Sequence, residues 1–216
     1  MLEVKGLEAS YDNSITYYKY PDFTLDKGKC LAIVGSTGCG KTTLLNSLFN
    51  PFFVGRAKYK HFLLLEKDIS SYMNNIFNVV SFIPQFSQNA LNPCLTISDH
   101  IKHMKTKDYN IDNLFKRSMK MLGQLKLEQD VIKKYPHQLS GGMKQRLILM
   151  LGFLKQPELV VLDEPSTAID GITLKVILDF LKTKKTDGIS MLIVTHDLGF
   201  VKLIADDVMN LDSSLD

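Results

Sequence analysis

The segment at residues 35–42, Gly-Ser-Thr-Gly-Cys-Gly-Lys-Thr, constrains this chain more than any other feature. It follows a short apolar run at residues 30–34, which predicts a buried strand, and it precedes residues 41–49, whose leucines have helical spacing. A glycine-rich turn between a strand and a helix matches the full pattern G-x-x-x-x-G-K-[ST] of phosphate-binding loops. The segment therefore predicts an α/β fold with a nucleoside triphosphate site.

The residue types of this loop fit phosphate chemistry. Glycines let backbone N–H groups surround phosphates, and the start of the helix adds a favourable potential for anions. We expect Lys41 to reach the β- and γ-phosphates and the hydroxyl of Thr42 to bind Mg²⁺. The predicted ATP contacts in this region are Gly35, Ser36, Thr37, Gly38, Cys39, Gly40, Lys41, Thr42 and Thr43.

A second apolar run, at residues 159–162, ends in the acidic pair Asp163 and Glu164. Ligands of open α/β sheets bind at the carboxyl ends of strands. We therefore expect Asp163 to hold the Mg²⁺ shell and Glu164 to polarise the attacking water, a role that typically contributes ~10²–10⁴ in rate. The alternative is a solvated strand end before a turn, and the presence of a complete phosphate loop in the same chain makes it the weaker interpretation.

A second glycine-rich helix start, Ser140-Gly141-Gly142, lies within residues 139–146. The N-terminus of a helix is a potential anion site. Because one nucleotide needs only one phosphate loop, a second site makes most sense if it serves an ATP bound by another subunit. The alternative is an ordinary helix with Ser140 as its N-cap.

Three further residues are weaker candidates. Gln85 follows a predicted strand and could reach Mg²⁺ or the attacking water, but it also fits a turn. His196 ends another apolar strand beside the expected phosphate position, where a capping or surface histidine is the alternative. Tyr11 could stack on adenine, although it is one of 8 tyrosines in the chain.

Strands that alternate with helices predict a largely parallel sheet with helices on both faces. The early strands have no helix between them and predict an antiparallel patch beside the nucleotide. Residues 96–134 are helical and amphipathic, with polar breaks near residues 107–108 and near Gly123, so we interpret them as a helical insert. The predicted strands are residues 2–9, 30–34, 79–83, 159–162, 191–194 and 208–211, and the other predicted helices are 41–49, 141–155, 172–182 and 198–205.

Composition narrows the function classes. The net charge of +3 is too small to indicate nucleic acid by bulk electrostatics. No apolar run approaches the roughly 20 residues that span a bilayer, and the start of the chain lacks the layout of a signal peptide. An odd number of cysteines, 3, at unpatterned spacing favours a reducing cytosol. Any membrane role would be peripheral.

Taken in order, these residues resemble an ATP-binding cassette (ABC) ATPase over nearly the whole chain. Residues 139–146 are the specific element, because many ATPases have phosphate loops and few carry this signature just before an acidic strand. The matching motifs are the phosphate loop at 35–42, the Q-loop at Gln85, the signature at 139–146, the acidic motif at 159–164, the D-loop at 166–170, the switch histidine at His196 and the stacking aromatic at Tyr11.

The resemblance implies a single domain over residues 1–216. Its P-loop NTPase (RecA-like) core, with a parallel sheet and an antiparallel β subdomain, would comprise residues 1–84 and 136–216, and its helical subdomain residues 85–135. In this family two cassettes pack head to tail around two ATP molecules.

Roles for individual residues follow from the same resemblance. Contacts to the partner's γ-phosphate would come from the signature, and coupling between the sites from Asp170. The implied catalytic residues are Glu164, His196 and Gln85, the implied Mg²⁺ ligands are Thr42, Gln85 and Asp163, and the implied signature contacts are Ser140, Gly141 and Gly142.

A narrower similarity, at residues 90–97, 135–146 and 195–200, is to importers of peptides, nickel and metal chelates. It implies an ATP-hydrolysing importer subunit, peripheral on the cytoplasmic face of a bacterial membrane. Its partners would be a second, non-identical ABC ATPase, two permeases and, through them, an extracytoplasmic substrate-binding protein.

The chain departs from the family pattern in places. Ile169 replaces the usual leucine of the D-loop, Phe86 follows Gln85, and no glycine turn follows residues 208–211. A soluble ABC ATPase acting on DNA or ribosomes is the alternative function. A single cassette without a heptad insert argues against it, so we expect no nucleic-acid partner.

Overall fold

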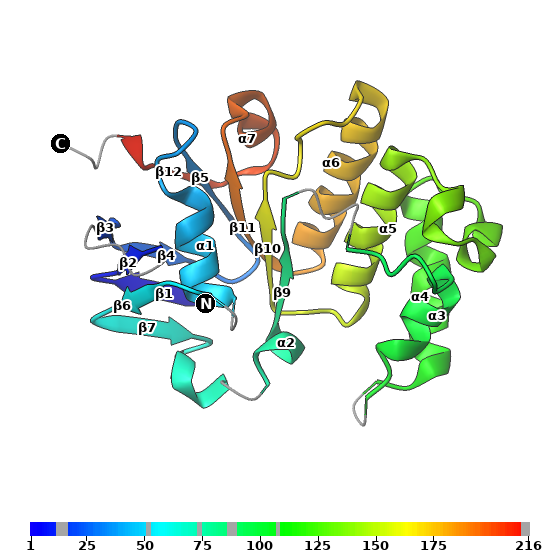
Figure 1. Ribbon diagram of the computed structural model, residues 1–216, viewed down its shortest axis with the longest axis horizontal. Coiled ribbons are helices and arrows are strands. Elements are labelled where there is room, and N and C mark those ends of the chain that lie inside the picture. Colours follow the sequence, from blue (N-terminus) through cyan, green and yellow to red (C-terminus); the bar gives the residue numbers. More distant parts are fainter. Residues whose placement is uncertain (12–16, 51–52, 73–74, 86–89, 107–108, 213–216) are drawn as a thin grey trace.

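A five-stranded parallel sheet forms the centre of the computed structural model, with the strand order β12-β5-β11-β10-β9 (Figure 1). The structure describes residues 1–11, 17–50, 53–72, 75–85, 90–106 and 109–212. The strands of the sheet are β5 (Cys30–Val34), β9 (Val80–Ile83), β10 (Leu159–Asp163), β11 (Ser190–Thr195) and β12 (Asp207–Asn210). Because all neighbours run in parallel, their carboxyl ends meet at one edge of the sheet.

Helices cover both faces of this sheet, as predicted. Along β10, Leu159 and Val161 pack into the core that contains α1, whereas Val160 and Leu162 pack into the core of α5 and α6. Burial on both sides explains why these strands are continuous apolar runs. The helices are α1 (Lys41–Phe49), α2 (Ile76–Val79), α3 (Ile97–His103), α4 (Ile111–Gln124), α5 (Gly141–Leu154), α6 (Gly171–Thr186) and α7 (Leu198–Ile204), with 3-10 turns at Ile69–Tyr72, Gln129–Lys133 and Pro136–Gln138.

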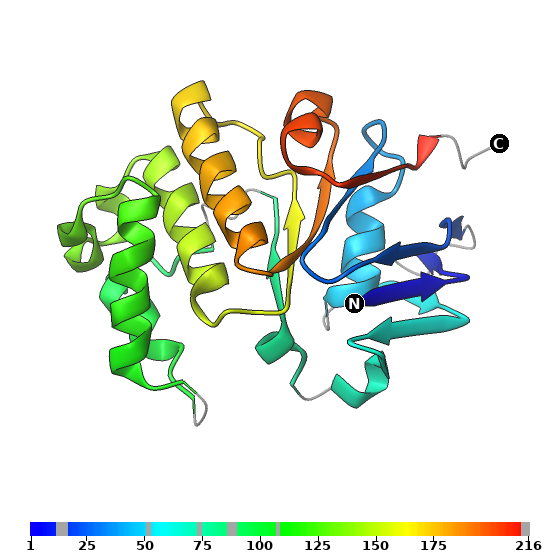
Figure 2. The ribbon, with the colours of Figure 1, turned by 180° about the vertical axis from the view of Figure 1, so that it is seen from behind.

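Antiparallel strands lie on the far side of α1 and enclose it against the parallel sheet (Figures 1 and 2). They form two sheets, with the orders β4-β1-β7-β8 and β3-β2-β6, which confirms the predicted antiparallel patch. The strands are β1 (Leu2–Lys5), β2 (Glu8–Ser10), β3 (Tyr18–Lys19), β4 (Phe23–Leu25), β6 (Arg56–Lys58), β7 (His61–Leu64) and β8 (Lys67–Asp68).

The prediction of one strand over residues 2–9 is wrong, because β1 and β2 belong to different sheets. Gly6 separates them with a φ of 61°, a conformation that favours glycine. A Cβ there would also lie only 2.7 Å from the side chain of Lys60. Before Gly6 the buried residues are at even positions, Leu2 and Val4, and after it they are at odd positions, Leu7 and Ala9. This change in the alternation is the mark that the bend leaves in the sequence.

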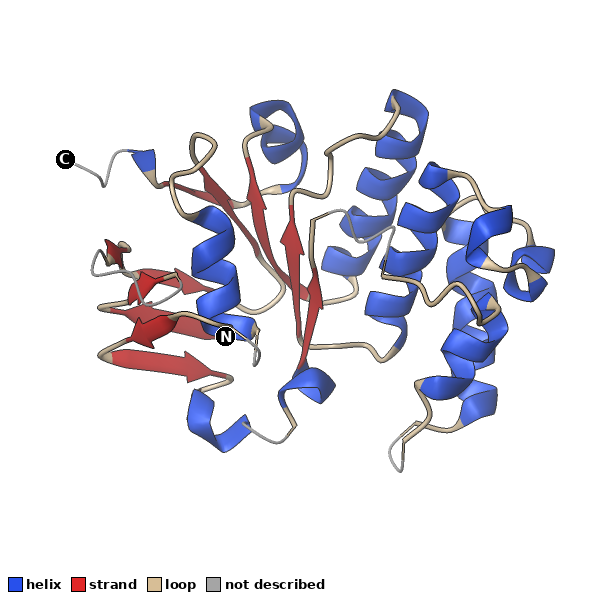
Figure 3. Cartoon of the chain, in the orientation of Figure 1, coloured by secondary structure: helices blue, strands red, loops and turns tan. Residues whose placement is uncertain are grey.

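The helical insert contains α3 and α4, which stand beyond α5 on one side of the molecule (Figure 3). Thr96 and Asp99 form a reciprocal capping box at the start of α3. The predicted break near Gly123 is confirmed: α4 ends at Gln124, and the chain turns at Lys126, with a φ of 51°. The other predicted break, at residues 107–108, lies outside the described residues.

The remaining predicted elements are present, with ends displaced by a few residues. The largest differences are that α6 extends to Thr186 and that Val79 ends α2 and does not begin β9. None of the helices in the described ranges combines the length and apolar character that a membrane crossing requires.

Candidate functional site

The glycine-rich loop connects the end of β5 to the start of α1. Gly38 and Gly40 have φ values of 89° and 95°, which residues with a side chain rarely adopt. The hydroxyl of Tyr20 donates a 3.0 Å hydrogen bond to the carbonyl of Gly40, and a Cβ on Gly40 would lie 2.9 Å from that hydroxyl. Tyr20, the residue after β3, therefore fixes the loop, and only glycine fits at this contact.

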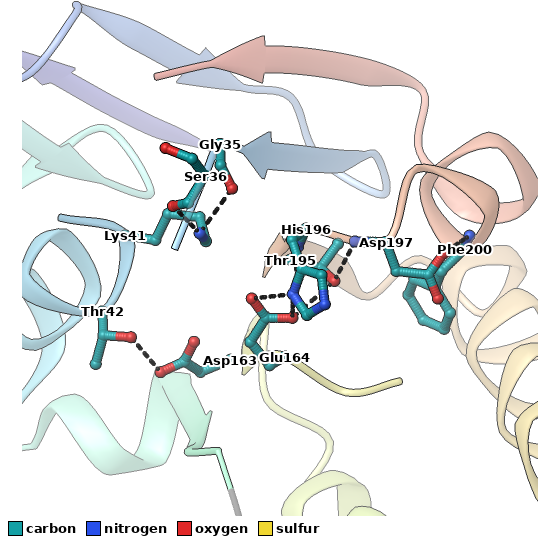
Figure 4. A network of polar contacts seen from close by, with 10 residues as sticks. All are labelled: Gly35, Ser36, Lys41, Thr42, Asp163, Glu164, Thr195, His196, Asp197 and Phe200. Atoms are coloured by element: carbon teal, nitrogen blue, oxygen red, sulfur yellow. Dashed lines mark hydrogen bonds and ion pairs between the residues drawn. The ribbon is translucent and has the colours of Figure 1, made fainter. Parts of the chain in front are cut away.

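Lys41 is buried at the first position of α1, and its ammonium folds back over the loop (Figure 4). Its Nζ donates to the carbonyl oxygens of Gly35 and Ser36, both at 2.8 Å. A lysine ammonium has three donors and is a compact point charge. The loop thus holds a positive charge at the start of a helix, where a phosphate is favoured.

Asp163 and Thr42 face each other across the gap between β10 and α1. The Thr42 hydroxyl donates to Oδ2 of Asp163 at 3.2 Å, and among the described residues Oδ1 is buried without a hydrogen-bond donor. Burial, with the nearby charge of Glu164, raises the pKa of Asp163 from 3.8 to about 6. A buried carboxylate beside a hydroxyl, with one oxygen unsatisfied, is a donor set that suits Mg²⁺.

Glu164 turns away from its own strand and meets the end of β11. Its φ of 50° lies in the left-handed region, an uncommon conformation for a residue with a side chain. Oε2 accepts a 2.9 Å hydrogen bond from Thr195, and Nδ1 of His196 lies 3.0 and 2.9 Å from Oε1 and Oε2 (Figure 4). The carboxylate is 8% exposed and is held by the neighbouring strand, as a positioned base requires.

A cavity of about 230 Å³ brings half of the predicted residues together. Gln85, Glu164 and His196 share it with the phosphate loop. Its full lining is Tyr18, Thr37, Gly38, Gly40, Lys41, Thr42, Thr43, Gln85, Glu164 and His196.

Tyr11 does not belong to that lining. Its ring is half-exposed and meets Phe53 edge-on, with 5.8 Å between ring centroids. Tyr18 is the aromatic residue that lines the cavity, and sequence reasoning missed it. Thr195 was missed as well, and its only signal is a hydroxyl at the end of an apolar strand, directly before His196. The predicted stacking role of Tyr11 stays a prediction.

The signature residues lie elsewhere, at the adjoining starts of α5 and α6. The hydroxyl of Ser140 accepts from the N–H of Met143 at 3.2 Å, so Ser140 is an N-cap. A Cβ on Gly142 would lie 2.9 Å from the Thr173 hydroxyl, which itself donates to Asp170. Asp170 and the signature glycines are therefore neighbours, and within the described ranges none of them lines the cavity at the phosphate loop.

Comparison with known proteins identifies the family. Residues 18–167 match the family model described as "ABC transporter". The chain belongs to the ABC transporter family. It is 32% identical to the dipeptide transport ATP-binding protein DppD of Bacillus subtilis, over 96% of this chain and 67% of that protein. It is 33% identical to the oligopeptide transport ATP-binding protein OppD of Lactococcus lactis, over 87% of this chain and 59% of that one.

Solved ABC structures show the same fold. A dimeric ATP-binding cassette in a post-hydrolysis state with ADP and Pi superposes with a TM-score of 0.78 at 21% identity, over 97% of this chain and 94% of that one. The cbiO1 subunit of an ABC transporter complex from Clostridium perfringens gives 0.75 at 25% identity, over 97% and 83%. The chain spans about three fifths to two thirds of the length of the curated ABC relatives named above.

Proposed function

We propose that this ABC cassette binds and hydrolyses ATP and thereby drives the import of peptides. The observation that carries the proposal is the convergence of Lys41, Thr42 and Glu164 on one cavity at the carboxyl edge of the parallel sheet. Lys41 supplies a cation for the phosphates, and Glu164 supplies an oriented carboxylate. Peptide cargo is proposed because the relatives are named as dipeptide and oligopeptide transport proteins.

Magnesium fits the oxygen set of this site. Thr42 and Asp163 would hold the ion, with Gln85 reaching it from the cavity wall. When bound, Mg²⁺ neutralises charge on the β- and γ-phosphates. The other roles belong to side chains of this protein. Lys41 binds phosphate oxygens, and Glu164 accepts the proton of the attacking water. Thr195 and His196 orient Glu164.

A second cassette would complete the site. The exposed start of α5, at Ser140 and Gly141, offers an anion site that its own cavity does not use. We assign Ser140, Gly141 and Gly142 to the γ-phosphate of a partner's ATP and Asp170 to the coupling between both sites. A non-identical partner cassette is proposed from the resemblance to peptide and metal importers.

A groove of about 370 Å³ beside β9 suits a membrane subunit. Apolar residues of β9, α5 and the end of α3 line it, among them Phe82, Leu151 and Met104, the residue that follows α3. Ile83 and Pro84 line both this groove and a small pocket beside Asp163 and Glu164. A short helix of a permease seated here would therefore press on the segment that leads to Gln85.

We propose that the chain works at the cytoplasmic face of the membrane, as a peripheral subunit under two permeases. An extracytoplasmic binding protein would deliver cargo to those permeases. Nickel and metal chelates are the competing cargo from the narrower resemblance. Uptake of a labelled peptide and of ⁶³Ni²⁺ by cells with and without Lys41→Ala separates the two, because loss of peptide uptake alone supports the proposal.

The substitution Glu164→Gln tests the hydrolytic role. It keeps the size of the side chain and removes the proton acceptor, so turnover should fall by roughly 10²–10⁴ while ATP still binds. Calorimetry and phosphate release measure the two effects, and gel filtration with ATP should show a closed cassette dimer. Glu158→Gln, just before the opposite end of the same strand, is the matched control, since the carboxylate of Glu158 lies at the surface and pairs with Lys27 at 3.2 Å. Unchanged turnover in Glu164→Gln would remove Glu164 from its role.

A further inference from the structure

The end of β12 lies beside the start of the phosphate loop. β12 runs parallel to β5 with Asn210 opposite Val34, and the N–H of Leu211 donates to the carbonyl of Val34 at 2.8 Å. The next residue, Asp212, therefore comes level with the first residues of the loop. Its own N–H donates to the side-chain oxygen of Asn210 at 3.0 Å, which fixes the turn that follows the strand.

The carboxylate of Asp212 binds Ser36 through both of its oxygens. The backbone N–H of Ser36 lies 3.0 and 2.9 Å from Oδ1 and Oδ2, and the Ser36 hydroxyl donates to Oδ1 at 2.8 Å. These bonds, with the charge of Lys41 nearby, lower the pKa of Asp212, which keeps it ionised at neutral pH. A carboxylate that accepts a backbone N–H forms one of the stronger hydrogen bonds in proteins.

The peptide between Gly35 and Ser36 is consequently held at both of its polar ends. Nζ of Lys41 donates to the carbonyl oxygen of Gly35 at 2.8 Å, and the carboxylate of Asp212 accepts from the N–H of Ser36. The same ammonium also holds the carbonyl of Ser36. A phosphate that draws Lys41 toward itself would weaken these two bonds, and among the described side chains Asp212 would still hold this peptide.

We infer that Asp212 is a positioning residue for the phosphate loop: it fixes the peptide between Gly35 and Ser36 while Lys41 exchanges loop carbonyls for a nucleotide phosphate. The inference rests on the proposed binding of ATP at this loop. A loop that is already ordered loses less conformational freedom on binding, so Asp212 strengthens ATP binding without touching the reacting atoms. If the carboxylate of Asp212 instead repelled the phosphates, it would weaken ATP binding. Whether ATP affinity falls or rises when Asp212 is removed therefore distinguishes the two effects.

The variants Asp212→Ala and Asp212→Asn separate the hydrogen bond from the charge. Asp212→Ala removes the acceptor, and the dissociation constant of ATP and its KM should rise about fivefold, with kcat within about twofold. Asp212→Asn retains an oxygen for the Ser36 N–H and should recover most of the affinity. Asp207→Ala, which removes the same charge at the beginning of β12, is the matched control and should behave as wild type.

Calorimetric titration with ATP, steady-state kinetics and thermal unfolding are compared across these variants. Tighter or unchanged ATP binding in Asp212→Ala would overturn the inference, as would an Asp212→Asn variant that binds as weakly as Asp212→Ala. If wild type itself bound no ATP, the proposed function would fail, and this outcome is distinct from a wild type that binds while the variants do not differ.

Amide exchange measured by NMR on the wild-type protein keeps the inference testable even if Asp212→Ala fails to fold. The N–H of Ser36 should be protected without nucleotide and stay protected when ATP is added. Protection that disappears on ATP binding would mean that Asp212 releases the loop, which contradicts a positioning role.

Discussion

Two helix starts in this cassette have similar sequences and different surroundings. At the start of α1, within the described residues, no side chain caps the helix, and the buried side chains of Lys41, Asp163 and Glu164 gather around it. At the start of α5, the Ser140 hydroxyl already accepts from a backbone N–H, and the neighbouring Gly141 is exposed. The first start therefore builds a site from its own chain, whereas the second offers only one wall of a site.

The site around α1 also carries a cost in stability that the start of α5 does not. Glu164 adopts a left-handed conformation, and Asp163 is buried with a raised pKa. Strain and buried charge of this kind persist where a ligand compensates for them. The comparison thus predicts that substitutions of the buried residues around α1 change folding and chemistry together, while a substitution of the exposed Gly141 at α5 changes only chemistry.

Gly141→Asp should lower turnover by a large factor at little or no cost in stability. A carboxylate in the first turn of α5 is favourable for the helix, but it repels a partner's γ-phosphate. ATP hydrolysis should fall by roughly 10²–10³, comparable to the loss of one transition-state donor, while the melting temperature stays constant or rises slightly. Asn113→Asp adds the same charge to the first turn of α4 and is the control. Equal turnover in both variants would show that α5 is only a capped helix.

The sequence predicted where the residues of the α1 site lie, because they belong to contiguous motifs at strand ends. Parallel strands bring Gly35 and Asp163 to one edge of the sheet whatever the rest of the chain does. Thr195 and Asp212 could not be predicted in the same way. Their roles depend on which strand end neighbours which, because β11 lies beside β10 and β12 beside β5.

Tyr18 and the strand break at Gly6 illustrate the same limit in the antiparallel region. Tyr18 lines the cavity because β3 pairs with β2, opposite Ala9, and such long-range pairing leaves no local signal. At Gly6 a signal exists, a change in the parity of buried residues, yet the loose alternation of residues 2–9 hides it. The proposed completion of the site at α5 by a second cassette depends on another chain and cannot be read from one sequence.

Asp163→Asn tests the stability cost at α1. Since folding raises the pKa of Asp163 from 3.8 to about 6, its ionisation destabilises the metal-free fold. This destabilisation is absent below about pH 4, grows as the pH rises through 6 and is complete above it, with an upper bound of roughly 3 kcal/mol.

In the presence of a chelator, Asp163→Asn should therefore unfold at higher urea concentration at pH 7.5, and it should lose much of the pH dependence between 4 and 6. ATP turnover should be abolished in the same variant. Asp207→Asn, on the exposed β12, should change neither property. A destabilised Asp163→Asn protein would mean that the carboxylate is well satisfied in the fold, and the contrast with α5 would disappear.

Thr195→Val probes whether Glu164 must be oriented by the neighbouring strand. The substitution preserves shape and removes the donor that lies 2.9 Å from Oε2 of Glu164. We expect kcat to fall roughly tenfold with little change in the KM for ATP, because the base loses its fixed geometry and the phosphate contacts remain. Thr24→Val, at an exposed position of β4, is the matched control. A change confined to KM would instead place Thr195 in nucleotide binding.

Tyr11→Ala tests whether the chain that binds ATP at α1 also supplies the aromatic ring that stacks on the adenine. Its effect on ATP binding should be the smallest of those predicted here. Stacking of a base on an aromatic ring contributes roughly 1–3 kcal/mol, and the ring of Tyr11 already packs edge-on against Phe53. The dissociation constant of ATP should therefore rise by about fivefold, whereas inorganic tripolyphosphate should bind unchanged. Tyr18→Ala, measured alongside, is the alternative, because Tyr18 lines the cavity. A larger base-specific loss in Tyr18→Ala would place adenine against β3 and leave Tyr11 as a packing residue.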